Sequence, residues 1–290
     1  MISFADFAKK MKLLTTSQKQ VLKVMTIYYQ PLSQTDLVTL LRACEVFKDN
    51  GKRFIPSDIR GLRKELVDEG WLTTDVMSRM VCHADFEEYL MRTAILDENF
   101  TFWVGVIRKL KPWKVYYTPI NYDATVRELR IAIYSSDDLT FEEALRFLRG
   151  VYETKWNEFD FVNKVFLPFD ARWFATYQPK VQAFALQYLI YGKIAQLKPT
   201  EEIQAYLESS ELLRLRTNEG ASIREKLAQI YVAKGMVKDL EALLLLESNP
   251  LNYNQYQGIL EFFKGQYTDC LLYTSPSPRD LSTSRMPSSA

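Results

Sequence analysis

The sequence contains very little histidine and cysteine, and this scarcity excludes several kinds of catalytic and metal site. His83 is the only histidine, so a site built from two imidazoles has no candidate residues, and a histidine-based triad has no alternative base. Cys44 and Cys82 stand far apart, which offers no disulfide framework and is typical of a reducing cytoplasm. The adjacent pair Cys82 and His83 lacks a second pair to complete a tetrahedral zinc site, so we expect both side chains to have packing roles.

Long apolar runs and catalytic motifs are also missing. No stretch of about 18 apolar residues occurs, and the start MISFADFAKKMKLL lacks the apolar core of a signal peptide, so we expect a cytoplasmic protein with no membrane partner. The phosphate-binding loop G-x-x-x-x-G-K-[ST], the elbow G-x-S-x-G and the zinc motif H-E-x-x-H are absent. Carboxylates lie in segments such as FEEAL and TEEIQ, which are typical of solvated helix faces. The sequence therefore predicts no catalytic residue, no metal site and no cofactor in this chain.

The segment CLLYTSPSPRD LSTSRMPSSA, residues 270–290, has no apolar period and differs from the rest of the chain. Back-translated, its first half resembles a transposase-based sequencing adapter, and its last seven codons resemble the flow-cell end of that adapter. We interpret residues 270–290 as a non-native, adapter-derived tail, and we expect the genuine sequence to be truncated near Asp269. A natural Pro/Ser-rich disordered tail is the alternative.

The charge balance is even. The tail carries Arg279, Arg285 and Asp280, so without it the 37 basic and 36 acidic residues become 35 of each. A neutral chain is not expected to coat nucleic acid or a membrane surface over its whole area. Its length favours two domains, and its high Leu, Tyr, Phe and Ile content is sufficient for packed cores.

Residues 15–95 carry the pattern of a winged-helix domain. Apolar residues recur at helical spacing in TTSQKQVLKVMTIYYQP, LSQTDLVTLLRAC and IPSDIRGLRKELVDEG, where Ser33 and Ser57 are placed to cap the second and third helices. Gly70 is placed to end the third helix. The segment WLTTDVMSRMVCH then alternates as two short strands with a turn near 77–78. Three helices followed by a β-ribbon indicate a winged helix, a relative of the helix-turn-helix.

From Ala84 onward the sequence predicts helices separated by short breaks such as KPW, SSDD and LPFD. The segments EKLAQIYVAKGMVKDLEALL and NYNQYQGILEFFKGQYTD each place a Tyr-bearing helix before a glycine turn, as tetratricopeptide (TPR) hairpins do. We therefore predict a mainly α protein with a lead-in at 1–14, the winged-helix domain at 15–95 and a truncated TPR-like helical-repeat domain at 96–269. The period is not strict, so an irregular helical domain remains the alternative.

The third predicted helix and its surroundings supply the candidate nucleic-acid-binding residues. In a winged helix the third helix enters the major groove and the wing touches the backbone. The candidate cations are Lys52, Arg53, Arg60, Arg63, Lys64 and Arg79. Four acidic residues in the same helix, Asp58, Glu65, Asp68 and Glu69, bring its net charge to about zero, so we expect weak binding to duplex DNA. A winged helix used for protein contact is the alternative.

A second cluster combines aromatic and basic residues in and before KLKPWKVYY. It consists of Trp103, Trp113, Tyr116 and Tyr117 beside Lys109, Lys111 and Lys114. Such a cluster could stack on nucleic acid. The alternative is interhelical packing with lysine stems covering the rings.

The order of these segments resembles a known family. IPSDIRGLRKELVDEGWL with the following ribbon, then LPFDARWFATYQPKVQAFALQYLIYGKIAQLKPTEEIQAYL, then YQGILEFFKGQYTD, is similar to the N-terminal region of bacterial Swi/Snf-type helicase-like ATPases. The resemblance spans most of residues 15–269 and rests on pattern and order. In that family the ATPase core lies far downstream, so the resemblance implies a non-catalytic accessory region, with ATP and magnesium needed only by the absent motor. It also implies duplex DNA as a partner, and protein partners bound through the helical repeats.

Two other functions remain open from the sequence. The chain could be a transcription regulator with a DNA-reading winged helix and a TPR-like sensor domain. It could also be a protein-interaction scaffold in which both parts bind proteins.

Overall fold

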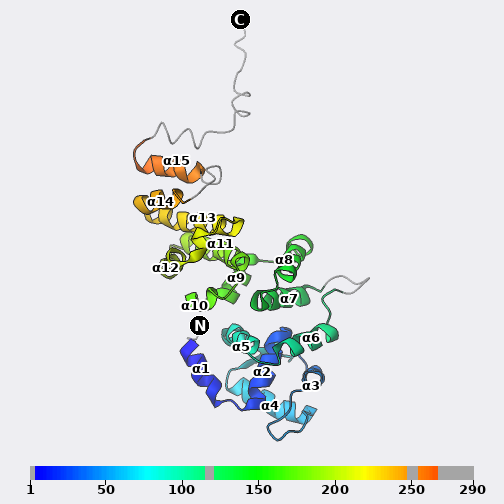
Figure 1. Cartoon of the computed structure of the whole chain (residues 1–290). Helices are drawn as coiled ribbons and strands as arrows, with labels where there is room; N and C mark the ends of the chain where they lie inside the picture. The colour runs from blue at the N-terminus through cyan, green and yellow to red at the C-terminus, as the bar shows by residue number, and fades with distance from the viewer. Residues whose placement is uncertain (1–3, 115–120, 247–253, 267–290) are drawn as a thin grey trace. The chain divides into compact units, whose positions relative to one another are not determined.

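In the computed structural model, the structure describes residues 4–114, 121–246 and 254–266. The protein is mainly α-helical, and the described residues contain a single two-stranded sheet (Figure 1). The chain divides into two compact units, 1–168 and 169–290, which are described separately. The domain boundary predicted after residue 95 falls inside the first unit, and that boundary stays a prediction. The segment interpreted as adapter-derived, 270–290, lies outside the described residues.

The elements of the first unit are α1 (Phe4–Leu13), α2 (Thr16–Tyr28), α3 (Gln34–Ala43), α4 (Pro56–Asp68), β1 (Leu72–Thr74), β2 (Met80–Cys82), α5 (Ala84–Ile95), α6 (Phe100–Leu110), α7 (Tyr122–Ser135), α8 (Asp138–Val151) and α9 (Glu158–Phe166). Those of the second unit are α10 (Ala171–Phe174), α11 (Pro179–Ala195), α12 (Glu201–Ser209), the 3₁₀ helix η1 (Glu211–Arg214), α13 (Asn218–Lys234), α14 (Val237–Leu244) and α15 (Asn254–Phe263).

Local capping explains where the first helices begin. Thr15 caps α2 by accepting from the backbone N–H of Gln18, and Ser33 caps α3, as predicted. The prediction for Ser57 is wrong, because the N-cap of α4 is Ile55, two residues earlier, and the helix begins at Pro56. Pro56 has its φ already fixed for a first helical position, and the side chain of Asp58 accepts from the N–H of Ile55 in place of a serine cap.

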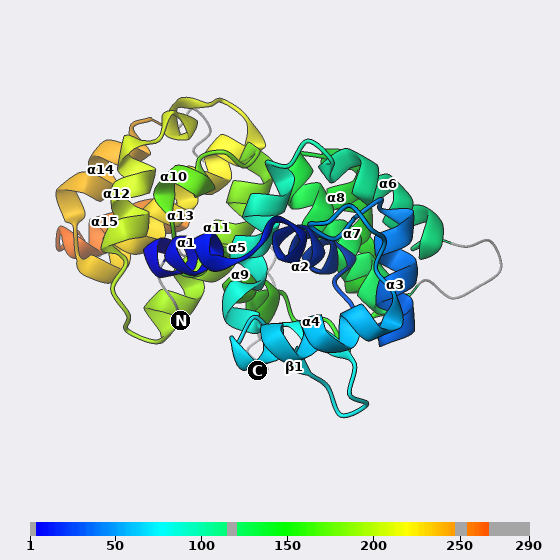
Figure 2. The ribbon, with the colours of Figure 1, turned by 90° about the horizontal axis from the view of Figure 1, so that it is seen from below.

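The end of α4 leads directly into the hairpin. Gly70 adopts a φ of +78°, a left-handed conformation that ends the helix as predicted. Strands β1 and β2 are antiparallel, with Leu72 opposite Cys82, and the hairpin turns around Ser78. A further bridge joins Leu32, between α2 and α3, to Met80 in β2 through two backbone hydrogen bonds of 3.0 and 2.8 Å. The hairpin therefore lies beside α4 and is hydrogen-bonded to the loop between α2 and α3 (Figure 2).

The core of the first unit lies around α2, which packs against α5, α6, α7 and β2. An aromatic cluster continues this core beneath the hairpin. The ring of Trp71 packs against Phe86 at 4.6 Å and against Phe7 at 5.9 Å, and Phe7 also stacks on Tyr89. Phe7 belongs to α1 and is buried, so residues expected only as a lead-in contribute to this core.

The described residues after Ala84 are helical or irregular, in agreement with the absence of predicted strands. Helices α5 to α8 fall in the segments that the sequence predicted. Helix α9 was not predicted, although Asn157 caps it by accepting from the N–H of Asp160. Its buried face carries Phe161 and Val165, four residues apart, which is the helical signal that the short segment EFDFVNKVF contains.

The later helices of the second unit pack in consecutive pairs. Helix α13 packs against α11, α12 and α14, and α14 packs against α15. The α13–α14 hairpin has the predicted order, with buried Tyr231 in the first helix and Gly235 at the turn. Lys264, after α15, forms an ion pair of 2.6 Å with Glu241 of α14. Among the described residues of the whole chain, no helix is both long and apolar enough to cross a membrane.

Candidate nucleic-acid interface

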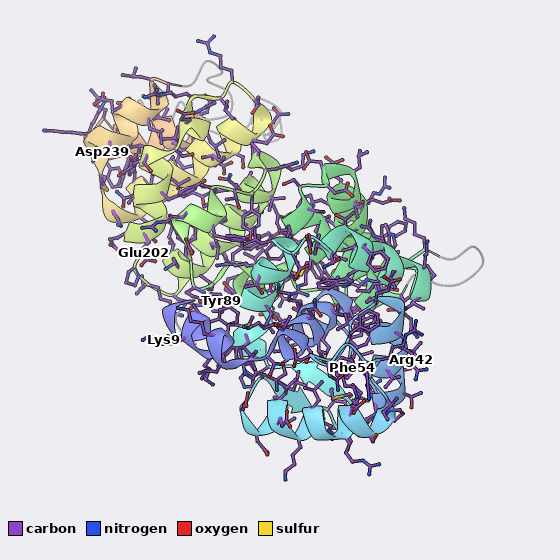
Figure 3. All side chains as sticks on the ribbon, turned by 60° about the horizontal axis from the view of Figure 1, so that its bottom comes forward. Lys9, Arg42, Phe54, Tyr89, Glu202 and Asp239 are labelled. Atoms are coloured by element: carbon purple, nitrogen blue, oxygen red, sulfur yellow. The ribbon has the colours of Figure 1, made fainter. Side chains whose placement is uncertain are left out.

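The predicted basic residues gather on and around α4. Arg60 and Lys64 are exposed and lie one turn apart, and Arg63 is half-buried beside them on the same helix. Lys52 and Arg53 are exposed in the loop before α4, where Arg53 forms an isolated bridge with Phe47. The outer face of α4, at the bottom of Figure 3, carries side chains that project away from the protein. Five of the six predicted cations therefore lie on this helix or on the loop that enters it.

These five cations are free within the part of the chain that the structure describes. The side chains of Lys52, Arg53, Arg60, Arg63 and Lys64 form no hydrogen bond or ion pair there. One of the acidic residues that brought the net charge of α4 to zero is already neutralised, because Asp58 pairs with Lys48 at 2.9 Å. Lys48 and the N–H of Ile55 hold the pKa of Asp58 below its usual range. The beginning of α4 is therefore more positive than its sequence alone indicates.

The other acidic residues lie toward the end of α4. Glu65 accepts a hydrogen bond of 3.2 Å from the Gln18 amide, and Asp68 and Glu69 occupy the last positions of the helix and its C-cap. Arg60, Arg63 and Lys64 all precede these acidic residues along α4. Recognition helices contact DNA bases mainly through their N-terminal residues, and Arg60 is the cation of α4 nearest that end.

The sixth predicted cation, Arg79, is engaged inside the hairpin. Its guanidinium group pairs with Asp75 at 2.7 Å, and the same carboxylate accepts from the N–H groups of Met77 and Arg79. Although burial opposes the ionisation of Asp75, these contacts lower its pKa. The tip of the hairpin instead presents Val76 and Met77, both fully or largely exposed. Arg79 is therefore less available for a phosphate than the five cations near α4.

The second basic and aromatic cluster is engaged in packing at Trp103, Trp113 and Lys114, whereas Lys109 and Lys111 are exposed. Trp103 is buried and its indole N–H donates to the carbonyl of Cys44 at 3.0 Å. Trp113 meets Phe147 edge-on, with the Lys114 ammonium 4.4 Å from the Trp113 ring centroid. Tyr116 and Tyr117 lie outside the described residues.

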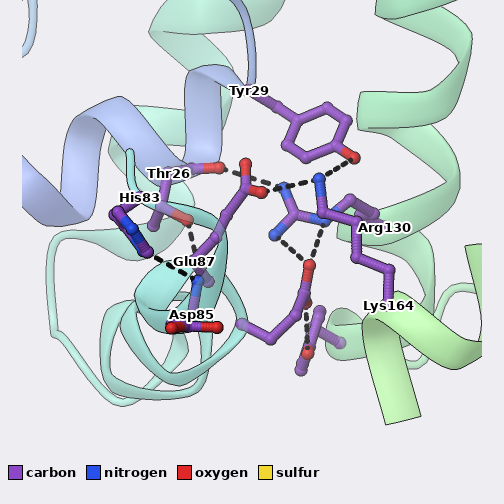
Figure 4. Close-up of polar contacts among 9 residues, drawn as sticks. Thr26, Tyr29, His83, Asp85, Glu87, Arg130 and Lys164 are labelled. Atoms are coloured by element: carbon purple, nitrogen blue, oxygen red, sulfur yellow. Dashed lines mark hydrogen bonds and ion pairs between the residues drawn. The ribbon is translucent and has the colours of Figure 1, made fainter. Parts of the chain in front are cut away.

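A charged cluster around the buried side chain of Arg130, which the sequence did not predict, lies in the same unit (Figure 4). The Arg130 guanidinium donates to Glu88 Oε1 at 2.7 and 3.0 Å and to the Thr26 carbonyl at 3.2 Å. Lys164 pairs with Glu87 at 2.7 Å and donates to the Tyr29 hydroxyl at 2.9 Å. The Tyr134 hydroxyl donates to the second oxygen of Glu88, so the buried carboxylates are satisfied. We refer to Tyr29, Glu87, Glu88, Arg130, Tyr134 and Lys164 as the charged cluster.

The electrostatics of the charged cluster favour fixed charges. Burial opposes the charge of Arg130, but Glu88 and Glu87 outweigh burial and raise its pKa. The pKa of Lys164 is raised in the same way by Glu87. Burial also raises the pKa of Tyr29, whose ring lies 3.9 Å from the Arg130 guanidinium carbon. The charged cluster therefore joins the end of α2 to α5, α7 and α9 through paired charges.

The cysteine and histidine side chains have packing and capping contacts. Cys44 and Cys82 are buried free thiols, and burial raises the pKa of Cys44 to about 12. His83 caps α5, where its Nδ1 accepts from the N–H of Asp85 at 3.2 Å. Within the described ranges, no group of three or more His, Cys, Asp or Glu residues could hold a metal ion.

Comparison of the chain with family models, with curated proteins and with solved structures finds no match.

Proposed function

We propose that residues 15–95 form a winged-helix domain that contacts duplex DNA through the beginning of α4 and its entry loop. The observation that carries this proposal is the set of five unpaired cations at that position, beside a carboxylate that Lys48 already neutralises. Phosphate neutralisation supplies most of the affinity of such contacts. Three helices followed by a hairpin, with a bridge from Leu32 to the second strand, support the winged-helix assignment.

The proposed role of the whole chain is that of an accessory region. Its resemblance to the N-terminal region of Swi/Snf-type helicase-like ATPases supports the view that it positions a DNA-dependent motor, while the chain itself has no catalytic function. The paired helices of the second unit support a TPR-like arrangement that binds protein partners. In this proposal ATP and magnesium act only in the motor, and this chain engages DNA and partners in the cytoplasm.

DNA binding is tested by fluorescence anisotropy with a random-sequence duplex at about 50 mM salt. We expect weak binding that the double variant Arg60→Glu and Lys64→Glu reduces at least about tenfold, since both phosphate-directed charges are reversed. The matched control is Arg146→Glu with Lys238→Glu, which makes the same charge change at exposed positions in α8 and α14.

Two results would count against the DNA interface. Absence of binding by the unmodified protein at low salt would favour the scaffold. Equal losses in the two double variants would mean that net charge, and not the face of α4, governs the interaction.

The accessory role is tested on the gene from which the chain derives. We expect its reading frame to continue for several hundred codons beyond Asp269 and to encode a phosphate-binding loop with helicase motifs. A stop codon soon after Asp269 would contradict the motor and leave the regulator or the scaffold. The DNA-binding experiment separates those two, because only the regulator requires duplex binding through α4.

A further inference from the structure

A cavity of about 290 Å³ lies beside the charged cluster, between the end of α2, the start of α7 and the segment that enters α9. Four aromatic rings line it, those of Tyr29, Tyr122, Trp156 and Phe161, together with the carboxylates of Asp123 and Asp160. This volume is near the lower limit of small-ligand sites. The combination of rings and carboxylates decides which ligand chemistry the cavity favours.

The rings are held in place by contacts with the protein itself. Tyr29 has a left-handed backbone at φ +60°, a conformation that costs a non-glycine residue free energy and is maintained by its surroundings. Tyr122 meets Tyr152 edge-on at 5.2 Å, and Trp156 packs against Phe161 at 5.0 Å. The aromatic walls therefore do not depend on a ligand for their position.

The side chain of Lys155 already lies over one of the aromatic rings of this cavity. The Lys155 ammonium lies 3.7 Å from the centroid of the Tyr122 ring. Its side chain is 59% exposed, and its only ion pair among the described residues is a long one of 3.9 Å to Asp123. An ammonium held this loosely can leave at little cost, so Lys155 shows where a bound cation would sit.

The charge of the cavity without Lys155 is negative. The other lysine at the wall, Lys164, is neutralised by Glu87 at 2.7 Å. Asp123 would lose its long contact with Lys155, and the Asp160 carboxylate forms no ion pair with any residue that the structure describes. The Tyr29 ring already carries Arg130 and Lys164, but two carboxylates and the three other rings would remain for a ligand. This arrangement favours a positive ligand.

We propose that this cavity binds an organic cation, of the alkylammonium or guanidinium class, in the position that the Lys155 ammonium occupies. The cation would lie over Tyr122 and be neutralised by Asp123 and Asp160. The proposal does not depend on DNA binding by α4, because it involves neither that helix nor its cations. A nucleotide is the competing ligand, since bases stack on tyrosine and phosphates pair with lysine.

Removal of the Lys155 charge distinguishes these two ligands. The variant Lys155→Met keeps most of the aliphatic stem and removes the competing ammonium. We expect it to bind tetramethylammonium and N-acetylarginine amide about two- to fivefold more tightly than the unmodified full chain, by isothermal titration calorimetry. A nucleotide such as AMP would instead lose affinity, because its phosphate would lose a cation. The matched control Lys109→Met, at an exposed position in α6, should leave the affinity unchanged.

Two further variants test the walls of the cavity. Tyr122→Leu and Asp160→Asn should each weaken cation binding at least about threefold, with an unchanged circular dichroism spectrum. Tighter binding of tetramethylammonium would indicate a free quaternary ammonium ligand, and tighter binding of N-acetylarginine amide would indicate an arginine side chain. Failure of both probes to bind either Lys155→Met or the unmodified chain would overturn the proposal, as would weaker cation binding by Lys155→Met.

Discussion

Arg130 shows how single residues organise the first unit. It is almost completely buried, yet each side of its guanidinium group has a partner in Glu88, Thr26 or the Tyr29 ring. A buried charge of this kind is tolerated only when it is paired. Removal of either Arg130 or Glu88 would therefore leave the other charge buried without its partner.

Removing Arg130 should therefore be costly. Arg130→Met leaves the Glu88 carboxylate buried with only the Tyr134 hydroxyl, and we expect the free energy of unfolding to fall by about 3–5 kcal/mol. Urea denaturation followed by tryptophan fluorescence and circular dichroism measures this loss. The exposed control Arg146→Met should change stability by less than about 0.5 kcal/mol. A loss no larger than that of the control would show that the charged cluster contributes little to stability.

The charged cluster could not be predicted from the sequence because its members are far apart in it. Glu87 and Glu88 belong to one helix, Arg130 to another and Lys164 to a third. The available signal was local, since Arg130 lies inside the largely apolar run LRIAIY. A charged residue in such a run indicates burial with a partner, but the partner is determined by tertiary packing.

At the scale of elements, helices with strong caps and regular apolar spacing were predictable. Thr15, Ser33 and Gly70 act at the helix ends where their types favour those positions. The start of α4 was misplaced because Pro56 and Asp58 together replace a serine cap. Helix α9 was missed because it is short, so few apolar positions repeat within it.

Close packing between the end of η1 and α13 predicts that Gly220 cannot be replaced without loss of stability. A Cβ atom on Gly220 would lie 2.2 Å from the carbonyl oxygen of Leu215, which also accepts a 2.8 Å hydrogen bond from Arg224. We expect Gly220→Ala to destabilise the protein by about 1–3 kcal/mol, because backbone must move to accept the methyl group.

Gly105 is the matched control for this substitution. It lies inside α6, and a Cβ there would meet no atom within 4 Å. Gly105→Ala should raise stability by about 0.5–1 kcal/mol through helix propensity alone. Thermal denaturation compares the two variants. Equal effects of the two substitutions would contradict the packing that the structure gives to Gly220.

At the scale of the whole molecule, net charge does not show which charged side chains are paired. The balanced composition predicts weak interaction with nucleic acid, and this stays a prediction. The pairing of Asp58 with Lys48 and of Arg79 with Asp75 depends on tertiary and turn geometry that periodicity does not provide. The mainly α class and the order of elements from α2 to α8, by contrast, follow from local patterns and were predicted.

In the proposed function, the beginning of α4 and its entry loop bind duplex DNA through unpaired cations. The most direct measurement is the dependence of the DNA association constant on salt concentration, for the unmodified chain and for the double variant Arg60→Glu and Lys64→Glu. We predict that the logarithm of the association constant falls with the logarithm of the salt concentration. The slope should be shallower by about two in the variant, because two phosphate contacts are lost and their counterions are no longer released. Identical slopes for the two proteins would contradict contact between duplex DNA and the side chains of Arg60 and Lys64.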